Sequence, residues 1–218
     1  MLTAAVLGAL DWVALATVAT AVATLVLAIA TFASVRAAAR SARAAEESLA
    51  AQLWPLLTPT RPEDPEQKVL FQDRHKVIVP GGQGAAEAAE EAVYFAIPVR
   101  NVGPGLAVLD AWHFRPGRRF GNDDHADLAE FRRLTRDLYI PPGDVGFWQG
   151  AIRDTTDPQF ADAAALARDH GEMTIELLYS DHLGSQRTIS RFVLTPIGDE
   201  RWLALGSRHF SLDRPAPR

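Results

Sequence analysis

The sequence predicts a mainly β protein with one N-terminal transmembrane helix, and three patterns along the chain support this fold class. Residues 12–35 contain no charged side chain, residues 36–54 contain no glycine or proline, and short apolar runs bounded by turn residues begin at Leu56. These patterns are typical of a membrane span, a continuing helix, and strands joined by turns. We therefore expect a transmembrane helix that continues into a juxtamembrane helix, then an antiparallel immunoglobulin-like β-sandwich with one inserted short helix.

The apolar run over residues 12–35 is long enough to cross a bilayer. At ~1.5 Å per residue it measures about 36 Å, against a hydrocarbon core about 30 Å thick. We expect Asp11 to cap the start of this helix and Trp12 to lie at the membrane interface. A cleaved signal peptide and a buried soluble helix are the alternatives, but no basic residue precedes the run, and it is long and uncharged.

The charges around the run predict its orientation in the membrane. Arg36, Arg40 and Arg43 follow the run, whereas only Asp11 precedes it. Because basic residues favour the cytoplasmic side, we expect the C-terminal part of the chain in the cytoplasm of a single-pass cell-membrane protein. The predicted organisation is a short extracytoplasmic tail (1–11), a transmembrane helix (12–35), a juxtamembrane helical stalk that ends before Pro55 (36–54) and a β-sandwich domain (55–218).

Small residues recur at every fourth position of the span, at Ala16, Thr20, Thr24 and Ala28. Such a stripe lets two membrane helices approach closely, and an alanine-rich helix also produces one by chance. Besides the lipid bilayer, the expected partners are therefore a membrane protein or a second copy of this chain, bound through the transmembrane helix. The stalk is either a solvated spacer or a helix that packs on a partner.

The remaining sequence alternates between strand and turn signals. The strands are expected near residues 56–60, 68–72 and 75–79, over 92–101 and 106–114, on both sides of the PPGD turn within 137–152, and over 172–181, 187–196 and 201–212. We expect a hairpin around SDHLGSQ, and a hairpin or a close strand pair around NVGPG. The segments expected outside strands are a mobile acidic loop (81–92), a short helix (128–133) and a helix (157–171) with Asp157 as N-cap, Pro158 in its first turn and Gly171 at its end.

The stretches RNVGPG, RDLYIPPGDVGFWQG, YSDHLGSQRTISRF and RHFSLDRP resemble an uncharacterised group of actinobacterial single-pass membrane proteins. The turn and hairpin layout also resembles bacterial immunoglobulin-like domains. The resemblance extends over nearly the whole chain and implies the membrane helix and the β-sandwich. It implies no activity and no site residues.

Composition excludes several classes of function. The net charge of -5 gives the chain no general affinity for nucleic acid, and the absence of cysteine excludes disulfides, thiolate metal sites and a cysteine nucleophile. We find no phosphate-binding loop, dinucleotide fingerprint, nucleophile elbow or HExxH motif, so no cofactor is expected and no catalytic residue is assigned.

Two polar clusters are candidates for chemistry. The loop NDDHAD brings together Asp123, Asp124, His125 and Asp127, which could bind a divalent cation, but it lacks the EF-hand spacing, and a solvated polar loop is the favoured explanation. The second cluster consists of Asp181 and His182 in a turn, with His209, Asp213, Ser185 and Ser190 as possible neighbours. A catalytic use of these groups predicts that His125, His182 and His209 converge in one cleft.

Arginines and aromatic residues have other expected uses. The cluster of Arg115, Arg118, Arg119, Arg132, Arg133 and Arg136 is expected either to bind an anionic lipid or acidic partner or to pair with the interleaved acids Asp123, Asp124, Asp127, Glu130 and Asp137. We expect Glu176 to pair with Arg187 and Arg191 across strands. Trp112, Trp148 and Trp202 are expected in the core, and a groove lined by Phe147, Trp148 and Tyr139 is the alternative.

The sequence therefore favours a membrane-tethered, non-catalytic interaction or scaffold module. A membrane-associated hydrolase or metal-dependent enzyme that uses the His and Asp groups is the alternative. A structural spacer in a larger envelope assembly is a third possibility.

Overall fold

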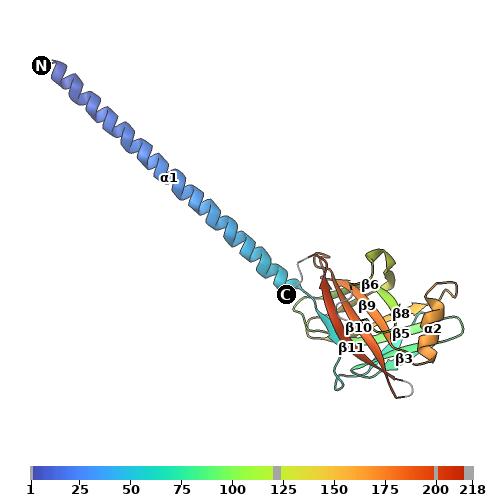
Figure 1. Ribbon diagram of the computed structural model, residues 1–218. Coiled ribbons are helices and arrows are strands. Elements are labelled where there is room, and N and C mark those ends of the chain that lie inside the picture. Colours follow the sequence, from blue (N-terminus) through green and yellow to red (C-terminus); the bar gives the residue numbers. More distant parts are fainter. Residues whose placement is uncertain (1, 120–123, 199–200, 214–218) are drawn as a thin grey trace. The chain divides into compact units, whose positions relative to one another are not determined.

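The computed structural model describes residues 2–119, 124–198 and 201–213. The chain divides into two compact units, Met1–Ala50 and Ala51–Arg218, and we call the second unit the β domain. The first unit lies within helix α1 (Leu2–Leu53), the blue coiled ribbon in Figure 1.

Helix α1 is long and apolar enough to span a membrane over Trp12–Leu53. Its large apolar side chains are exposed, as Leu25 (61%) and Phe32 (67%) illustrate. Thr17 donates its hydroxyl hydrogen bond to the carbonyl of Val13 at 2.8 Å, and the hydroxyls of Thr20, Thr24, Thr31 and Ser34 bond to the preceding turn in the same way. These hydroxyls therefore need no partner outside the helix.

The helix begins earlier than the sequence predicts. Asp11 lies inside α1, so the expected N-cap at Asp11 is wrong, and residues 2–11 are helical. The alanine- and leucine-rich start of the chain has high helix propensity, and a single acid does not interrupt it. The predicted end is confirmed, since α1 stops at Leu53, two residues before Pro55.

The β domain contains eleven strands and two short helices in the described residues. The strands are β1 (Leu57–Pro59), β2 (Gln67–Leu70), β3 (Lys76–Val79), β4 (Gln83–Ala88), β5 (Val93–Asn101), β6 (Ala107–Pro116), β7 (Arg132–Ile140), β8 (Val145–Ile152), β9 (Met173–Ser180), β10 (Thr188–Ile197) and β11 (Arg201–Ser211). The helices are the 3₁₀-helix η1 (Leu128–Glu130) and α2 (Phe160–Arg168).

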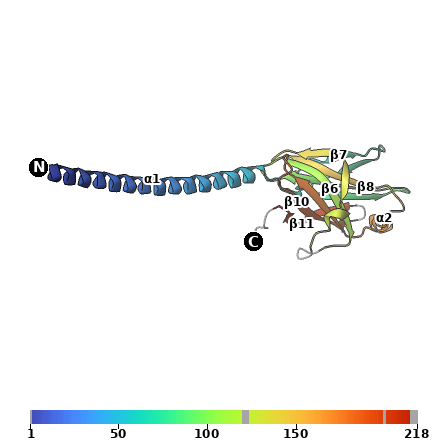
Figure 2. The same cartoon turned by 90° about the horizontal axis from the view of Figure 1, so that it is seen from above.

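Nine of these strands form one antiparallel sheet in the order β1-β5-β4-β11-β10-β9-β6-β7, with β8 added beside β5. The sheet curls into a half-barrel, and β2 and β3 form a separate two-stranded ribbon. Figure 2 shows β6, β7 and β8 near one another on one side of the domain. The mainly β, antiparallel prediction is confirmed, whereas an immunoglobulin-like pair of separate sheets is not.

Two strand predictions are wrong for non-local reasons. The expected acidic loop at residues 81–92 contains β4, which pairs with β5 and β11. A Cβ on Gly84 would lie 2.4 Å from the side chain of Leu194, so a larger residue there would force that side chain to shift. The segments around NVGPG do not form a hairpin, because β5 pairs with β1, β4 and β8, whereas β6 pairs with β7 and β9.

The inserted helix is shorter than expected. Helix α2 begins at Phe160 with Gln159 as its N-cap, so the expected N-cap at Asp157 is wrong. The carboxylate of Asp157 instead accepts a hydrogen bond from the Gln159 amide and binds Arg132. The chain turns after α2 at His170, which has the positive φ of 51°, and the Gly171 amide then donates to the Leu166 carbonyl.

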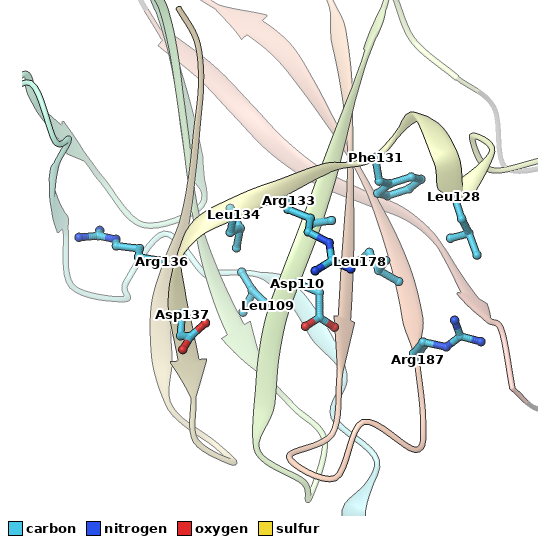
Figure 3. A pocket seen from close by; sticks show the side chains of 11 residues that line it. Leu109, Asp110, Leu128, Phe131, Arg133, Leu134, Arg136, Asp137, Leu178 and Arg187 are labelled. Carbon is cyan, nitrogen blue, oxygen red and sulfur yellow. The ribbon is translucent and has the colours of Figure 1, made fainter.

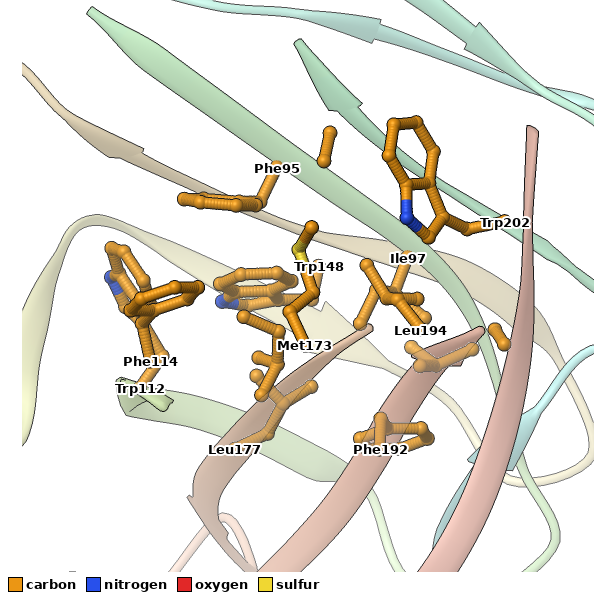
Figure 4. Packing of buried hydrophobic residues seen from close by; sticks show 14 of the residues in the cluster. Phe95, Ile97, Trp112, Phe114, Trp148, Met173, Leu177, Phe192, Leu194 and Trp202 are labelled. Carbon is orange, nitrogen blue, oxygen red and sulfur yellow. The ribbon is translucent and has the colours of Figure 1, made fainter. Parts of the chain in front are cut away.

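The main core lies inside the curled sheet and is shown in Figure 4. Trp112, Trp148 and Trp202 are buried there at 3%, 0% and 3% exposure, which confirms their predicted position. Trp112 and Trp148 pack edge to face with their ring centroids 5.2 Å apart. A second, smaller cluster lies between the β2–β3 ribbon and the outer face of β5 and β8.

The hairpin of β9 and β10 around SDHLGSQ is confirmed, and it carries a buried ion pair. Glu176 lies directly across from Arg191, and both side chains are 0% exposed. The Arg191 Nε atom donates to Glu176 Oε1 at 2.8 Å, and the Ala126 amide donates to Glu176 Oε2 at the same distance. The expected pairing of Arg187 with Glu176 is wrong, since Arg187 lies at the turn end of the hairpin and binds Asp213.

Candidate functional site

The ladder between β6 and β7 is interrupted near its middle. Leu109 pairs with Leu138, but Ala111 already pairs with Arg133, so residues 134–137 of β7 lie opposite Asp110 alone. The same residue of β6 is bulged against β9. This segment of β7 therefore leaves β6, and Figure 3 shows the cleft that results.

The cleft has a volume of about 430 Å³ and is lined by both apolar and charged side chains. The apolar residues are Leu109, Ala111, Leu128, Phe131, Leu134 and Leu178, and the charged residues are Asp110, Arg133, Arg136, Asp137 and Arg187. The side chains come from β6, β7, β9 and the segment around η1, so residues far apart in sequence form one site.

Asp110 is the electrostatic centre of this cleft. Partial desolvation raises the pKa of its carboxyl, and Asp137 acts in the same direction, while the Ser180 hydroxyl and Arg133 oppose the shift. In Figure 3 the Asp110 carboxylate lies beside Arg133, with Asp137 on one side of it and Arg187 on the other. Two acids and three arginines thus line the cleft together with its apolar side chains.

Two of the arginines are anchored outside the cleft. Arg136 donates to Gln149 Oε1 at 2.8 Å, which links β7 to β8 across the open side of the half-barrel. Arg187 binds the Asp213 carboxylate at 2.7 Å. These contacts hold Arg136 and Arg187 in place, so the cleft is suited to a ligand that places an apolar group among charges of both signs.

The three histidines do not share one cavity. His125 packs edge to face on Phe210, and its Nδ1 atom lies 2.7 Å from the Ala126 carbonyl. His182 is exposed in the turn between β9 and β10. His209 lies on β11 with its Nδ1 atom 2.7 Å from Ser190 Oγ. A hydrolase or metal-dependent enzyme that uses these histidines requires them to converge in one cleft. That prediction is therefore wrong.

Ser190 and His209 have the spacing of a nucleophile and its base, but the serine is fully buried. Its hydroxyl also lies 2.8 Å from the Tyr179 hydroxyl, which accepts from the Leu57 amide at 3.1 Å. Burial raises the pKa of Tyr179 to about 12, so this group stays protonated. The chain of hydrogen bonds joins β1 to the β9–β10 hairpin and serves the fold.

Asp181 also serves its own turn. Its carboxylate accepts from the amides of Leu183 and Ser185 at 2.9 Å and from the Ser185 hydroxyl at 2.6 Å. Burial raises the pKa of Asp181, but these hydrogen bonds outweigh it and hold the pKa below its usual value. With its oxygens occupied by the turn, Asp181 does not orient a histidine.

The NDDHAD loop is also used internally. Asn122 and Asp123 lie outside the described residues. The Asp124 carbonyl accepts from Arg191, and the Asp127 carboxylate accepts from the Ala129 amide at the start of η1. The described residues contain no group of three acidic or histidine side chains arranged around a metal position.

The arginine cluster divides between several places. Arg133 and Arg136 line the cleft, Arg115, Arg119 and Arg132 line another cavity, and Arg118 lies 3.9 Å from Glu172. Arg132 pairs with an acid inside the domain, as expected. Its partner is Asp157, however, so the predicted pairing with the interleaved acids is wrong for this arginine. The expected groove of Phe147, Trp148 and Tyr139 does not form, because Trp148 is buried in the core while Tyr139 is 57% exposed.

Sequence reasoning missed the cleft itself. Its only local signal is Asp110, a single acid within the apolar run LAVLDAWHF. Leu178 and Leu134 look like ordinary strand residues in the sequence.

The chain matches no protein-family model, and no curated protein is similar to it.

Proposed function

We propose that this protein is a single-pass membrane-tethered interaction module, without catalytic activity, whose β domain lies in the cytoplasm. The membrane tether is supported by α1, whose apolar side chains are exposed over the length of a bilayer. The orientation is supported by Arg36, Arg40 and Arg43, which follow the uncharged run. The resemblance to actinobacterial single-pass membrane proteins agrees with this arrangement.

The observation that carries the interaction role is the cleft at the interrupted β6–β7 ladder. The cleft combines apolar side chains with charges of both signs, and protein-binding surfaces contain the same combination. We propose that it binds a segment of another protein through one apolar side chain, which lies near Leu134 and Leu178. Flanking charges of that segment then meet Asp110 and Arg133.

The transmembrane helix offers a second contact. The small residues Ala16, Thr20, Thr24 and Ala28 allow a close approach of another membrane helix, from a membrane protein or a second copy of this chain. The hydroxyls of Thr20 and Thr24 are already bonded within α1, so this contact depends on shape rather than on polar groups.

The tether is tested by a charged substitution in the middle of the span. Leu25→Arg is expected to move a large part of the chain from the carbonate-washed membrane pellet to the soluble fraction, because arginine at the centre of a span costs ~2.5–3.5 kcal/mol. Leu49→Arg, an equally exposed change on the same helix but in the stalk, is expected to leave the chain in the pellet. Equal behaviour of the two variants contradicts the tether.

Protease treatment of intact cells tests the orientation. Protease added to sealed cells is expected to spare the β domain of the unaltered chain, and protease added after lysis is expected to digest it. Digestion in sealed cells contradicts the cytoplasmic placement and leaves the tether intact.

The cleft is tested by photocrosslinking in the full-length chain. A photoreactive phenylalanine analogue in place of Leu128, which lines the cleft and is 39% exposed, is expected to capture a discrete protein in native membranes. The control places the analogue at Ile78, which is 49% exposed on β3. No product from position 128, or the same product from both positions, contradicts a partner in the cleft.

A further inference from the structure

A second cavity of about 470 Å³ lies beside the outer face of β6, where the start of β7 meets the turn before α2. It shares no residue with the cleft described above. It is lined by His113, Arg115, Arg119, Glu130, Arg132, Asp157, Pro158 and Gln159. Three arginines and a histidine thus face one space that also contains two acids.

The arginines in this cavity differ in whether an acid binds them. Arg132 is held by the Asp157 carboxylate at 2.9 Å and by Gln159 Oε1 at 2.8 Å. Glu130 Oε2 lies 3.6 Å from His113 Nε2, and the Glu130 side chain is 58% exposed. In the part of the chain that the structure describes, the guanidinium groups of Arg115 and Arg119 have no acid or carbonyl partner. Two arginines are therefore available to a ligand.

Several buried nitrogen atoms at the cavity also lack partners. His113 is 4% exposed, and among the described residues its Nδ1 atom has no hydrogen-bond partner. The buried Nε atoms of Arg119 and Arg132 also have no hydrogen-bond partner among the described residues. Buried donors are costly to leave unbonded, and groups of this kind in native proteins often mark the place of a ligand.

The cavity therefore has the chemistry of an oxyanion site. A phosphate group presents several oxygen acceptors, which match the planar donor fork of arginine. We propose that this cavity binds a phosphate monoester, held by Arg115 and Arg119 with His113 at its base. The same group occurs in soluble phosphorylated metabolites and in the headgroup of phosphatidic acid, so either source presents the chemistry that the site recognises.

Binding is measured by calorimetry on the full-length chain in neutral detergent at low salt. The probes are inorganic phosphate, dihexanoyl phosphatidic acid and, as a lipid control, dihexanoyl phosphatidylcholine. We expect saturable binding of at least one phosphate probe and none of phosphatidylcholine. Similar affinity for both phosphate probes assigns the site to soluble phosphates, and binding of phosphatidic acid alone assigns it to the lipid headgroup.

Matched arginine substitutions locate the site. Arg115→Gln and Arg119→Gln are each expected to weaken binding about tenfold, the usual loss for one charge-assisted hydrogen bond. Arg118→Gln removes the same charge from the same segment outside the cavity and is expected to change the affinity less than about twofold. The proposal is overturned if neither phosphate probe binds, or if Arg118→Gln weakens binding as much as the other two.

Discussion

Replacing Arg191 by methionine is expected to lower the free energy of unfolding of the β domain by about 3–5 kcal/mol. Methionine keeps much of the side-chain volume but leaves the Glu176 carboxylate buried without its cation. Both side chains are 0% exposed, so water does not compensate for the loss. Arg191 also donates to the Asp124 carbonyl at 2.7 Å, and that contact with the loop before η1 is lost as well.

A second substitution separates two effects of Arg191→Met: the unpaired charge that it leaves on Glu176, and the packing that it removes. Glu176→Gln removes the charge but keeps an oxygen that accepts from the Ala126 amide. The Arg191→Met, Glu176→Gln double variant is therefore expected to be more stable than the Arg191→Met single variant by about 1–3 kcal/mol. Urea unfolding of the full-length chain in detergent, followed by tryptophan fluorescence, measures each difference.

Arg187→Met provides the matched control. Its partner is Asp213, and the two side chains are 46% and 27% exposed, so this pair contributes less than about 1 kcal/mol. If Arg187→Met destabilises the domain as much as Arg191→Met, or if the double variant is less stable than the single variant, burial of charge is not the cause.

This ion pair also shows what sequence reasoning captures well. The β9–β10 hairpin was predictable because its strands are adjacent in the chain and joined by a turn with Asp and Gly, so the register follows from local chemistry. That register places Glu176 directly opposite Arg191. The core tryptophans were predictable because they lie in short apolar strand runs, and the apolar helix because its uncharged run is long enough to span a bilayer.

The cleft was not predictable, because it depends on how distant strands pair. It exists because β6 and β7 pair at both ends but not where residues 134–137 leave the ladder. Residues 128–133 were expected to be helical, yet only η1 is, and β7 already begins at Arg132. Strand β4 was missed likewise, since its glycine, its three alanines and its one glutamate have low strand propensity, and pairing with β5 and β11 outweighs this.

Trp148→Ala is expected to destabilise the β domain by about 3–5 kcal/mol, the usual loss for a fully buried large aromatic side chain. Trp148 is 0% exposed and lies inside the curled sheet, where it packs edge to face on Trp112. Gly150 shows how closely this part of the core is filled, because a Cβ there would lie 2.5 Å from Trp148 and 2.9 Å from Trp112. Removal of the indole therefore leaves a cavity that its neighbours do not fill.

Trp12→Ala is the matched control for this loss. Trp12 is 76% exposed on α1, and its removal is expected to leave the unfolding midpoint of the β domain unchanged. Trp148→Phe is expected to cost less than the alanine variant, because it keeps an aromatic ring and removes an Nε1 donor that has no partner among the described residues. A loss below about 1 kcal/mol for Trp148→Ala contradicts a core centred on this residue, since such values are typical of surface positions.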